Sequence, residues 1–318
     1  VPIVCEIKKN QAERIGVEEL KVYDDSFQFP DGNATPQGTY EEIMEAGRRM
    51  YTEMSPETAD FIKMMFDRDL FDVVAKPGKA TGGYCCDIPG YECPFIFSNF
   101  NGTSGDVDVL THEAGHAFAS YMADKHVDLL DLRLPSMEAA ETHSMSMEFF
   151  ATPWYKLFFK EQTKKYELSH LEGTLNFIPY GCLVDHFQEI VYEHPEMTPK
   201  ERNEAWLKLD KMYRPYLDMA DMPFYGRGAG WQRQSHIYAT PFYYIDYCLA
   251  QTVALQFWLE MEKDWKQAWE KYKAFVKRGG TDTFLGLVAG AGLKSPVEDG
   301  CIREIAGHAS EWIKEHKL

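Results

Sequence analysis

The chain has 318 residues, of which 45% are hydrophobic and 14% aromatic, so it can bury a large core and is not an intrinsically disordered protein. Its formal net charge of −17 argues against nucleic acids and anionic membrane surfaces as partners. The seven cysteines are odd in number, scattered and without C-x-x-C spacing, which favours reduced thiols and a cytoplasmic location. We see neither a signal-peptide pattern nor an apolar run of membrane-spanning length.

In the first part of the chain, apolar residues recur at helical spacing from 39 to 51 and again from 55 to about 72. Ser55-Pro56-Glu57-Thr58 is typical of a helix start. Residues 1–35, by contrast, are mixed and charged and end in the turn-rich stretch 29–33, so no element is predicted there.

The only clear β region follows the break at residues 76–83. Residues 84–87 and 94–100 are expected to form two short strands, with Ile88-Pro89-Gly90 turning between them. The rest of the chain is expected to be helical over 105–124, 137–159, 171–193, 199–213, 241–265, 267–278, 281–289 and 296–314. The predicted fold class is therefore mainly α, with a small β-sheet.

An H-E-x-x-H motif, His112-Glu113-Ala114-Gly115-His116, lies within the predicted helix 105–124. His112 and His116 are one turn apart on the same helix face, so both imidazoles can bind one Zn²⁺ ion. Glu113 lies beside that ion and would take a proton from a water that the metal activates. Because such pentapeptides also occur by chance, a surface pair of histidines is the alternative.

A catalytic zinc site needs a third protein ligand, and the next predicted helix offers Glu138, Glu141 and Glu148. Three carboxylates along one helix stripe would repel each other, unless a cation faces them. A solvated acidic face is the alternative, but Met145, Phe149 and Phe150 make this helix too apolar for simple exposure. Any of the three acids could be the ligand on this reasoning.

Longer segments carry a resemblance to a known family: residues 79–84 (KATGGY), 112–118 (HEAGHAF), 138–150 (EAAETHSMSMEFF), 235–247 (SHIYATPFYYIDY) and 291–296 (AGLKSP). Together they resemble the oligoendopeptidase F branch of the thimet-oligopeptidase family of zinc metallopeptidases. The resemblance implies a zincin-like helical catalytic domain with the small sheet beside the H-E-x-x-H helix. It also implies one Zn²⁺ per chain.

The resemblance selects among the three acids. The family's third zinc ligand lies 25 residues after the second histidine and seven before another glutamate, which fits Glu141 and leaves Glu138 as the fallback. Glu148 would then orient a ligand imidazole.

The resemblance also places a histidine and tyrosines after a glycine-rich loop, where they bind the substrate and the oxyanion. His236 matches that histidine. Tyr244 and Tyr247 share a helix face and are the expected donors, whereas Tyr243 is expected to point elsewhere. Such tyrosines are also common in protein cores, so packing is the alternative for both.

Strand 94–100 resembles the edge strand on which these peptidases lay an extended peptide. We therefore expect Gly82, Gly83 and Tyr84, together with Phe97 and Asn99, to contact the substrate. Backbone pairing of this kind gives broad specificity.

Family members are considerably longer, so residues 1–318 are expected to be the catalytic C-terminal half, with the family's N-terminal half absent from this chain. The expected function is zinc-dependent endopeptidase cleavage of short unstructured oligopeptides, with Glu113 as general base. A catalytically silent zinc- and peptide-binding fragment is one alternative. A zinc aminopeptidase or carboxypeptidase is another, although residues 105–110 do not match the G-x-M-E-N element of aminopeptidases.

Overall fold

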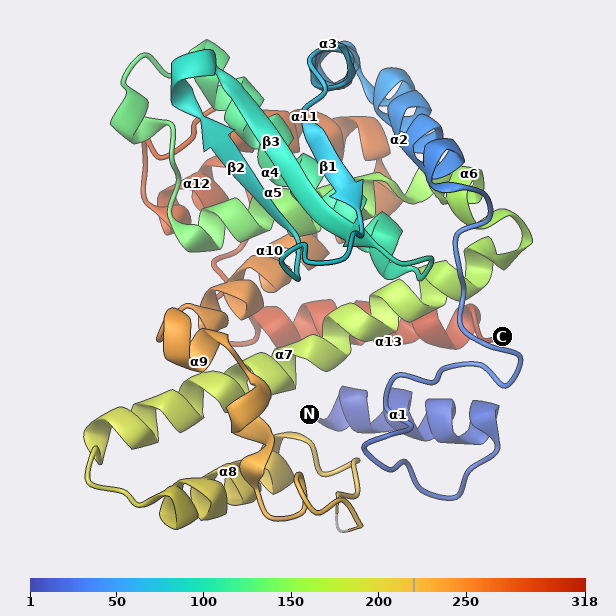
Figure 1. The fold of residues 1–318 in the computed structure, drawn as a ribbon, viewed down its shortest axis with the longest axis vertical. Helices are drawn as coiled ribbons and strands as arrows, with labels where there is room; N and C mark the ends of the chain where they lie inside the picture. Colours follow the sequence, from blue (N-terminus) through green and yellow to red (C-terminus); the bar gives the residue numbers. More distant parts are fainter. Residues whose placement is uncertain (220) are drawn as a thin grey trace. The chain divides into compact units, whose positions relative to one another are not determined.

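The computed structural model describes residues 1–219 and 221–318, and these divide into two compact units. Unit 1 comprises Val1–Asn33, Leu168–Leu249 and Ala306–Leu318, and unit 2 comprises Ala34–Glu167 and Ala250–Ile305. Three helices contribute residues to both units (Figure 1): α7 (Thr163–Glu193), α10 (Tyr244–Lys263) and α13 (Cys301–Glu315).

Unit 2 contains a small sheet among helices. Its strands are β1 (Phe71–Val74), β2 (Tyr84–Ile88) and β3 (Cys93–Phe100). Its remaining helices are α2 (Tyr40–Met54), α3 (Pro56–Asp67), α4 (Gly105–His126), α5 (Met137–Phe150), α6 (Tyr155–Phe159), α11 (Trp265–Val276) and α12 (Phe284–Gly290), with short 3₁₀ turns at Pro89–Tyr91, Leu130–Leu132, Thr152–Trp154 and Lys160–Gln162. Helix α4 packs against both β2 and β3, so the sheet lies beside the H-E-x-x-H helix.

The strand order is β1-β3-β2, with β1 parallel and β2 antiparallel to β3. The prediction that strand 94–100 is an edge strand is therefore wrong, because β3 is the central strand. Strand β1 was not predicted, because its apolar residues continue the helical spacing of α3 and were assigned to that helix. The helix ends at Asp67, and Asp69 with a φ of 54° reverses the chain into β1.

The core of unit 2 is built from aromatic side chains on several helices. Phe61 of α3 packs edge-on against Phe118 of α4, with ring centroids 5.6 Å apart, and Phe118 stacks on Trp269 of α11. Phe150 of α5 contacts the same tryptophan at 5.1 Å. These contacts fix α4 and α5 in a common framework.

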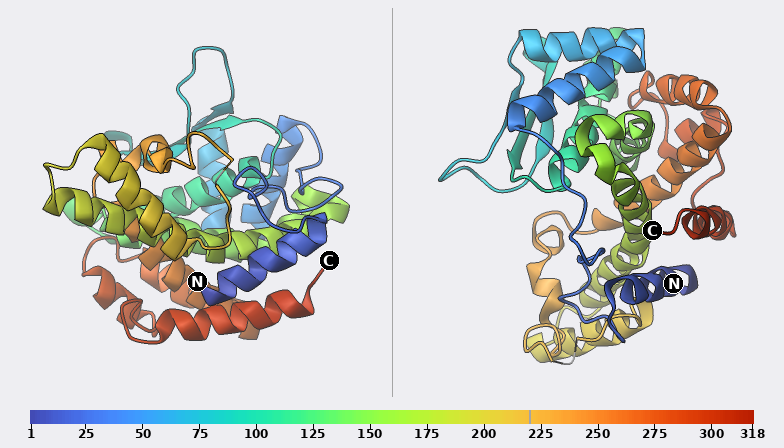
Figure 2. Two further views of the ribbon diagram at one scale, coloured as in Figure 1. Left: turned by 90° about the horizontal axis from the view of Figure 1, so that it is seen from below. Right: turned by 90° about the vertical axis from the view of Figure 1, so that its right-hand side faces the viewer.

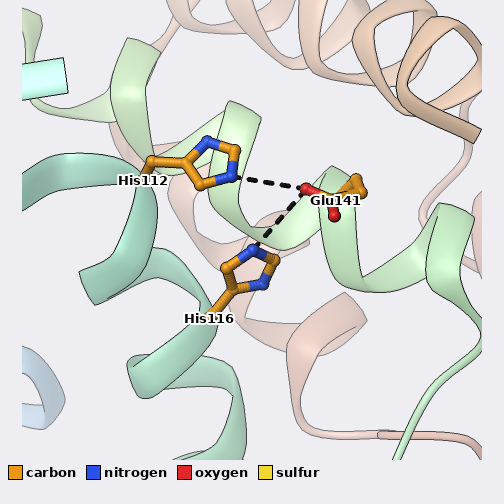
Figure 3. Close-up of side chains that lie close together, drawn as sticks. All are labelled: His112, His116 and Glu141. Carbon is orange, nitrogen blue, oxygen red and sulfur yellow. Dashed lines mark ion pairs between the residues drawn. The ribbon is translucent and has the colours of Figure 1, made fainter. Parts of the chain in front are cut away.

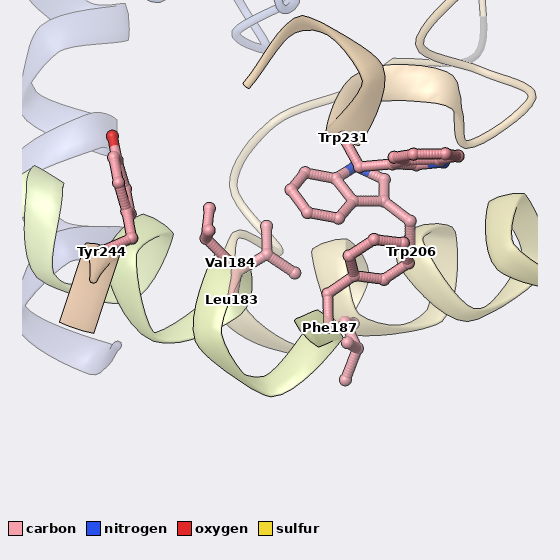
Figure 4. Packing of buried hydrophobic residues seen from close by; sticks show 7 residues of the cluster. Leu183, Val184, Phe187, Trp206, Trp231 and Tyr244 are labelled. Atoms are coloured by element: carbon pink, nitrogen blue, oxygen red, sulfur yellow. The ribbon is translucent and has the colours of Figure 1, made fainter. Parts of the chain in front are cut away.

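Unit 1 contains α1 (Pro2–Ile15), α8 (Pro199–Tyr213), the 3₁₀ turn Ala229–Arg233 and α9 (His236–Ala239) beside its parts of the shared helices. A buried hydrophobic cluster joins α7, α8, the 229–233 turn and the start of α10 (Figure 4): Leu183, Val184, Phe187, Trp206, Leu209, Trp231 and Tyr244. Helix α1 was not predicted. Its buried face includes Lys8 and Gln11, which bond to Asp25 and to backbone carbonyls of residues 24–27, so the apolar period is weak.

Most predicted helices are confirmed. Ser55 and Thr198 both cap their helices through the reciprocal hydrogen bonds of a capping box. The predicted helix 137–159 is instead divided, because Pro153 interrupts it after Phe150. The mainly helical fold with a small sheet is confirmed, and no helix in the described part of the chain has the length and apolar character needed to cross a membrane.

Candidate metal centre

The two motif histidines lie on one face of α4, as their spacing predicts. Their rings are 5.0 Å apart between centroids and nearly perpendicular. Both side chains are about one-fifth exposed, so they are reachable from solvent although the helix itself is largely buried. Helix α4 therefore presents two imidazoles toward a common point.

Helix α5 approaches α4 closely because Gly115 has no side chain. A Cβ atom at Gly115 would lie 2.6 Å from Cα of Ser144 and 2.9 Å from the carbonyl oxygen of His143. The glycine within the H-E-x-x-H motif is thus the residue that lets α5 cross directly over the histidines. The sequence alone does not indicate why a glycine is needed here, because the reason is the close contact between α4 and α5.

Glu141 on α5 completes the group (Figure 3). Its Oε2 atom lies 3.3 Å from Nε2 of His112 and 3.5 Å from Nε2 of His116. The carboxylate is buried, and Ser144 donates a hydrogen bond to the same oxygen at 3.3 Å. Among the described residues this is the one His/Cys/Asp/Glu cluster arranged to hold a metal ion.

The donor set and its spacing fit a zinc ion. Two atoms that each bind a tetrahedral Zn²⁺ at roughly 2.0–2.1 Å are about 3.3–3.4 Å apart. The two nitrogen–oxygen separations of 3.3 and 3.5 Å agree with this value. Two imidazoles and one carboxylate also match the three protein ligands of open, catalytic zinc sites.

Of the other two acids, Glu148 contacts the cluster directly. Its Oε1 atom lies 2.6 Å from Nδ1 of His112, on the ring side opposite the nitrogen that faces Glu141. Glu138 is outside the metal-binding group, and its backbone carbonyl accepts a bond from Thr142. The geometry therefore favours Glu141 over Glu138 as the third ligand.

Glu113 lies on the neighbouring face of α4 and is buried. Burial raises the pKa of its carboxyl above the ordinary value, and the positive charges of His112 and His116 oppose that shift. A hydrogen bond from the Cys85 backbone on strand β2 also reaches it. The sheet thus holds Glu113 in place beside the two histidines.

The electrostatics of the cluster reflect the packing of the carboxylate against two imidazoles. Burial raises the pKa of Glu141, but the hydrogen bonds and charges of His112 and His116 together outweigh it and place the pKa well below the ordinary value. Burial lowers the pKa of His112, yet Glu141 and Glu148 together raise it well above the usual range. The site therefore favours the ionised form of the Glu141 carboxylate, which is the form that binds a metal ion.

The five predicted substrate-contacting residues all lie at one end of the β2–β3 pair. Tyr84 stacks on Phe97 with centroids 4.9 Å apart, and the amide of Asn99 donates to the carbonyl oxygens of Ala80 and Gly82. In both views of Figure 2 the connection between β1 and β2, residues 75–83, extends away from the helices of its unit. Asn99 thus fixes the base of this connection, including Gly82 and Gly83.

His236, Tyr244 and Tyr247 form a second cluster, which belongs to unit 1, whereas the metal-binding group belongs to unit 2. The His236 ring lies 4.9 Å from that of Tyr244 and 6.0 Å from that of Tyr247. Tyr243 joins the same cluster, since its ring is 4.9 Å from that of Tyr247, so the expectation that it points elsewhere is wrong. The short helix α9 and the bend before α10 shift the helical register that the prediction assumed.

Gln234, which sequence reasoning missed, bonds to Nδ1 of His236 at 2.6 Å. Because the amide nitrogen of Gln234 donates, Nδ1 of His236 is the acceptor. In a neutral His236 the ring proton is therefore on Nε2. The available signal in the sequence was a glutamine two residues before His236. Tyr244 is buried and belongs to the hydrophobic cluster around Phe187 and Trp206, so it also has a packing role.

Comparison with known proteins identifies the family. The model of peptidase family M3 matches residues 5–307. Among curated proteins, oligopeptidase PepF of Bacillus subtilis is 24% identical over 273 residues, which are 83% of this chain and 40% of that protein. An oligoendopeptidase F homologue of Mycoplasma genitalium is 26% identical over 140 residues, 43% of this chain and 22% of that protein.

Solved structures agree with the family match. A structure of PZ peptidase A with an inhibitor has a TM-score of 0.96 and 51% identity, covering 99% of this chain and 56% of that one. A provisionally named oligoendopeptidase F from Bacillus anthracis has a TM-score of 0.89 and 48% identity. The match covers 100% of this chain and 55% of that one. The chain therefore spans about 40% of PepF and a little over half of these structures.

Proposed function

Because the chain belongs to peptidase family M3, we propose that residues 1–318 form the catalytic part of a zinc-dependent endopeptidase that hydrolyses short, unstructured oligopeptides. The observation that carries the proposal is the meeting of His112 and His116 with Glu141 on two crossing helices, with Glu113 buried beside them. The oligopeptidase and oligoendopeptidase names of the relatives support the substrate class.

In this proposal one Zn²⁺ per chain is held by His112, His116 and Glu141. When bound, such an ion supplies Lewis acidity and lowers the pKa of a water. Glu113 takes the proton of the attacking water and passes it to the leaving amine. Its raised pKa suits this task, because a base whose pKa lies nearer neutrality can both accept and return the proton.

Glu148 fixes the His112 ring in this account. By accepting the Nδ1 proton it holds Nε2 as the nitrogen that faces Glu141. A carboxylate that accepts a hydrogen bond from a ligand histidine sets both the tautomer and the basicity of that histidine.

We assign oxyanion stabilisation to a donor from His236, Tyr244 or Tyr247. The mutual packing of the three rings supports a shared role, and the proton on Nε2 of a neutral His236 makes it a donor. Of the two tyrosines, Tyr247 is the less buried, which favours it over Tyr244 for contact with a substrate.

For substrate binding we propose backbone pairing of an extended peptide at the outer strand β2, rather than at the central strand β3. Gly82 and Gly83 lead into β2, which begins at Tyr84, and Phe97 and Asn99 contact this end of the strand from β3. Pairing through the main chain holds peptides with little regard to sequence.

The two alternatives predict different behaviour toward the same pair of peptides. One is an internally quenched peptide blocked at both ends, and the other has the same sequence with free ends. An endopeptidase cleaves both, an exopeptidase cleaves only the free-ended peptide, and a silent fragment binds both without cleaving them. The Glu113→Gln chain is the matched control, and equal cleavage by it would contradict the proposed base.

A further inference from the structure

Unit 1 contains a cavity of about 430 Å³ whose lining includes Tyr244 but neither His236 nor Tyr247. Every residue that lines it lies in Val1–Asn33 or Leu168–Leu249, so the cavity belongs to one compact unit. Its walls come from α1, α7, α8, the 214–234 segment and the start of α10. Its size is within the usual range for sites that bind small ligands.

The cavity is cationic, although the chain as a whole carries a net charge of −17. Lys8, Arg214 and Arg233 line it, and Asp25 is the one lining carboxylate. Lys8 pairs with Asp25 at 2.6 Å, and Nε of Arg214 pairs with Asp210 at 2.8 Å. Arg233 has no carboxylate partner among the described residues, so its charge is uncompensated.

Both arginines act on Tyr180, Arg214 by direct contact with its ring and Arg233 through its positive charge. The Arg214 guanidinium lies 4.8 Å from the centre of the Tyr180 ring and is mostly buried. Burial raises the pKa of Tyr180, and the positive charges of both Arg214 and Arg233 oppose this rise. Arg214 uses Nε for Asp210, and within residues 1–219 and 221–318 neither terminal nitrogen has a hydrogen-bond partner.

Neutral polar groups complete the lining. Oδ1 of Asn176 is buried in the wall and has no hydrogen-bond partner among the described residues, so it can accept an N–H from a ligand. Burial raises the pKa of Tyr216, which keeps its phenol protonated and able to donate. Tyr225 is fixed by a 2.6 Å bond from Nη1 of Arg233.

The apolar surface of the cavity is aromatic. Phe177 and Tyr244 pack together with ring centroids 5.7 Å apart, and Trp206 forms another part of the wall. Gly230 permits this arrangement, because a Cβ there would lie 2.8 Å from Nε1 of Trp206. An apolar side chain can therefore be bound next to the arginines.

We propose that this cavity binds the C-terminal end of a peptide, with its carboxylate on Arg214 and Arg233, its last amide N–H on Asn176 and its last side chain against the aromatic wall. Guanidinium groups are well suited to carboxylates because their N–H donors match the two oxygens. That the ligand is a peptide rests on the proposed function. The carboxylate site itself rests only on the cavity.

Binding is measured by calorimetry on the 318-residue chain carrying Glu113→Gln, so that the ligand is not consumed. The probes are N-acetyl-Ala-Phe with a free carboxylate, the same peptide as its C-terminal amide, and N-acetyl-Glu-Phe amide. The acid should bind about tenfold or more tightly than its amide. Equal affinities of the acid and its amide would overturn the proposal.

Variants locate the site. Arg233→Gln, which alters an exposed side chain, should weaken binding of the acid about fivefold or more and leave the amide unaffected. Arg214→Gln combined with Asp210→Asn should do the same without leaving a buried carboxylate unpaired. Arg227→Gln removes the same charge outside the cavity and should have no effect, and an equal loss there would contradict the assignment.

N-acetyl-Glu-Phe amide, the third probe, distinguishes a C-terminal carboxylate from the carboxylate of an acidic side chain. Tight binding of the Glu-Phe amide would overturn the assignment to a peptide C-terminus in favour of an acidic side chain. Failure of the proposed function is distinguishable, because it would abolish cleavage by the unmodified chain while these affinities remained.

Discussion

At the scale of single residues, the candidate site is a short set of contacts around one carboxylate oxygen. Oε2 of Glu141 faces both imidazoles, and Glu148 holds His112 from the other side. The motif spacing predicted the histidines, since a helix turn brings positions four apart together. It could not choose among Glu138, Glu141 and Glu148, because that choice depends on the crossing of α5 over α4.

Glu141→Ala should abolish stoichiometric zinc binding, because the remaining two imidazoles form an incomplete site. Zinc per chain after dialysis, measured by atomic emission, should fall from about one to near zero. Glu138→Ala is the matched control on the same helix and should retain the metal. Full zinc content in the Glu141 variant would show that the ligand is misassigned.

Glu148→Ala should weaken zinc binding by about 10–100-fold while leaving all three ligands in place. The reason is that Nδ1 of His112 loses its acceptor and the ring can reorient. Competition with a chromophoric chelator measures this affinity. Glu148→Gln keeps an acceptor oxygen and should recover part of the loss, whereas identical behaviour of the two variants would argue for a charge effect alone.

At the scale of elements, close approach of α4 and α5 builds the site. Gly115 makes that approach possible, and aromatic contacts to α3 and α11 fix both helices. Most helices could be predicted from apolar period and caps. Strand β1 and helix α1 could not, because β1 continues the pattern of α3 and α1 buries Lys8 and Gln11 through partners distant in sequence.

Gly115→Ala should separate α4 from α5 and cost about 1–3 kcal/mol of stability by overpacking, together with a loss of zinc affinity. Urea unfolding and zinc competition measure the two effects. Gly173→Ala on α7 is the control, since nothing lies within 4 Å of a Cβ there, and it should be neutral or slightly stabilising. Unchanged stability and zinc affinity in the Gly115 variant would contradict the close-approach argument.

The ion pair between Glu57 of α3 and Lys273 of α11, at 2.8 Å, should make stability depend on pH. Burial raises the pKa of Glu57, but the hydrogen bond and positive charge of Lys273, together with hydrogen bonds from the Glu57 backbone and Ser55, outweigh it. The net pKa lies below its ordinary value of 4.5. A lowered carboxyl pKa stabilises the fold above the unfolded value and ceases to do so as pH falls through the folded one.

Glu57→Gln should therefore destabilise the chain by about 1 kcal/mol near neutral pH, and the difference should shrink below pH 4.5. Urea midpoints across this range measure it. Glu45→Gln is the control, because it removes an ion pair with Arg48 in which both side chains are exposed. It should change the stability little at any pH. A difference that grows toward acid would refute the assigned sign.

At the scale of the whole molecule, the chain is a member of peptidase family M3 built from two compact units. The metal-binding group lies in unit 2, and the His236 cluster and the cationic cavity lie in unit 1. The family segments predicted both groups of residues, since they include the two motifs. The cavity could not be predicted, because Lys8, Asn176, Arg214 and Arg233 are separated in sequence and share no motif.

We propose that this chain cleaves peptides by means of a metal held at His112, His116 and Glu141. The most direct measurement is hydrolysis of an end-blocked, internally quenched peptide by the 318-residue chain, before and after removal of metal by a chelator and after addition of zinc. The chelator should abolish cleavage, and added zinc should restore it. Cleavage that persists in the metal-free chain, or its absence with zinc bound at the site, would contradict the proposal.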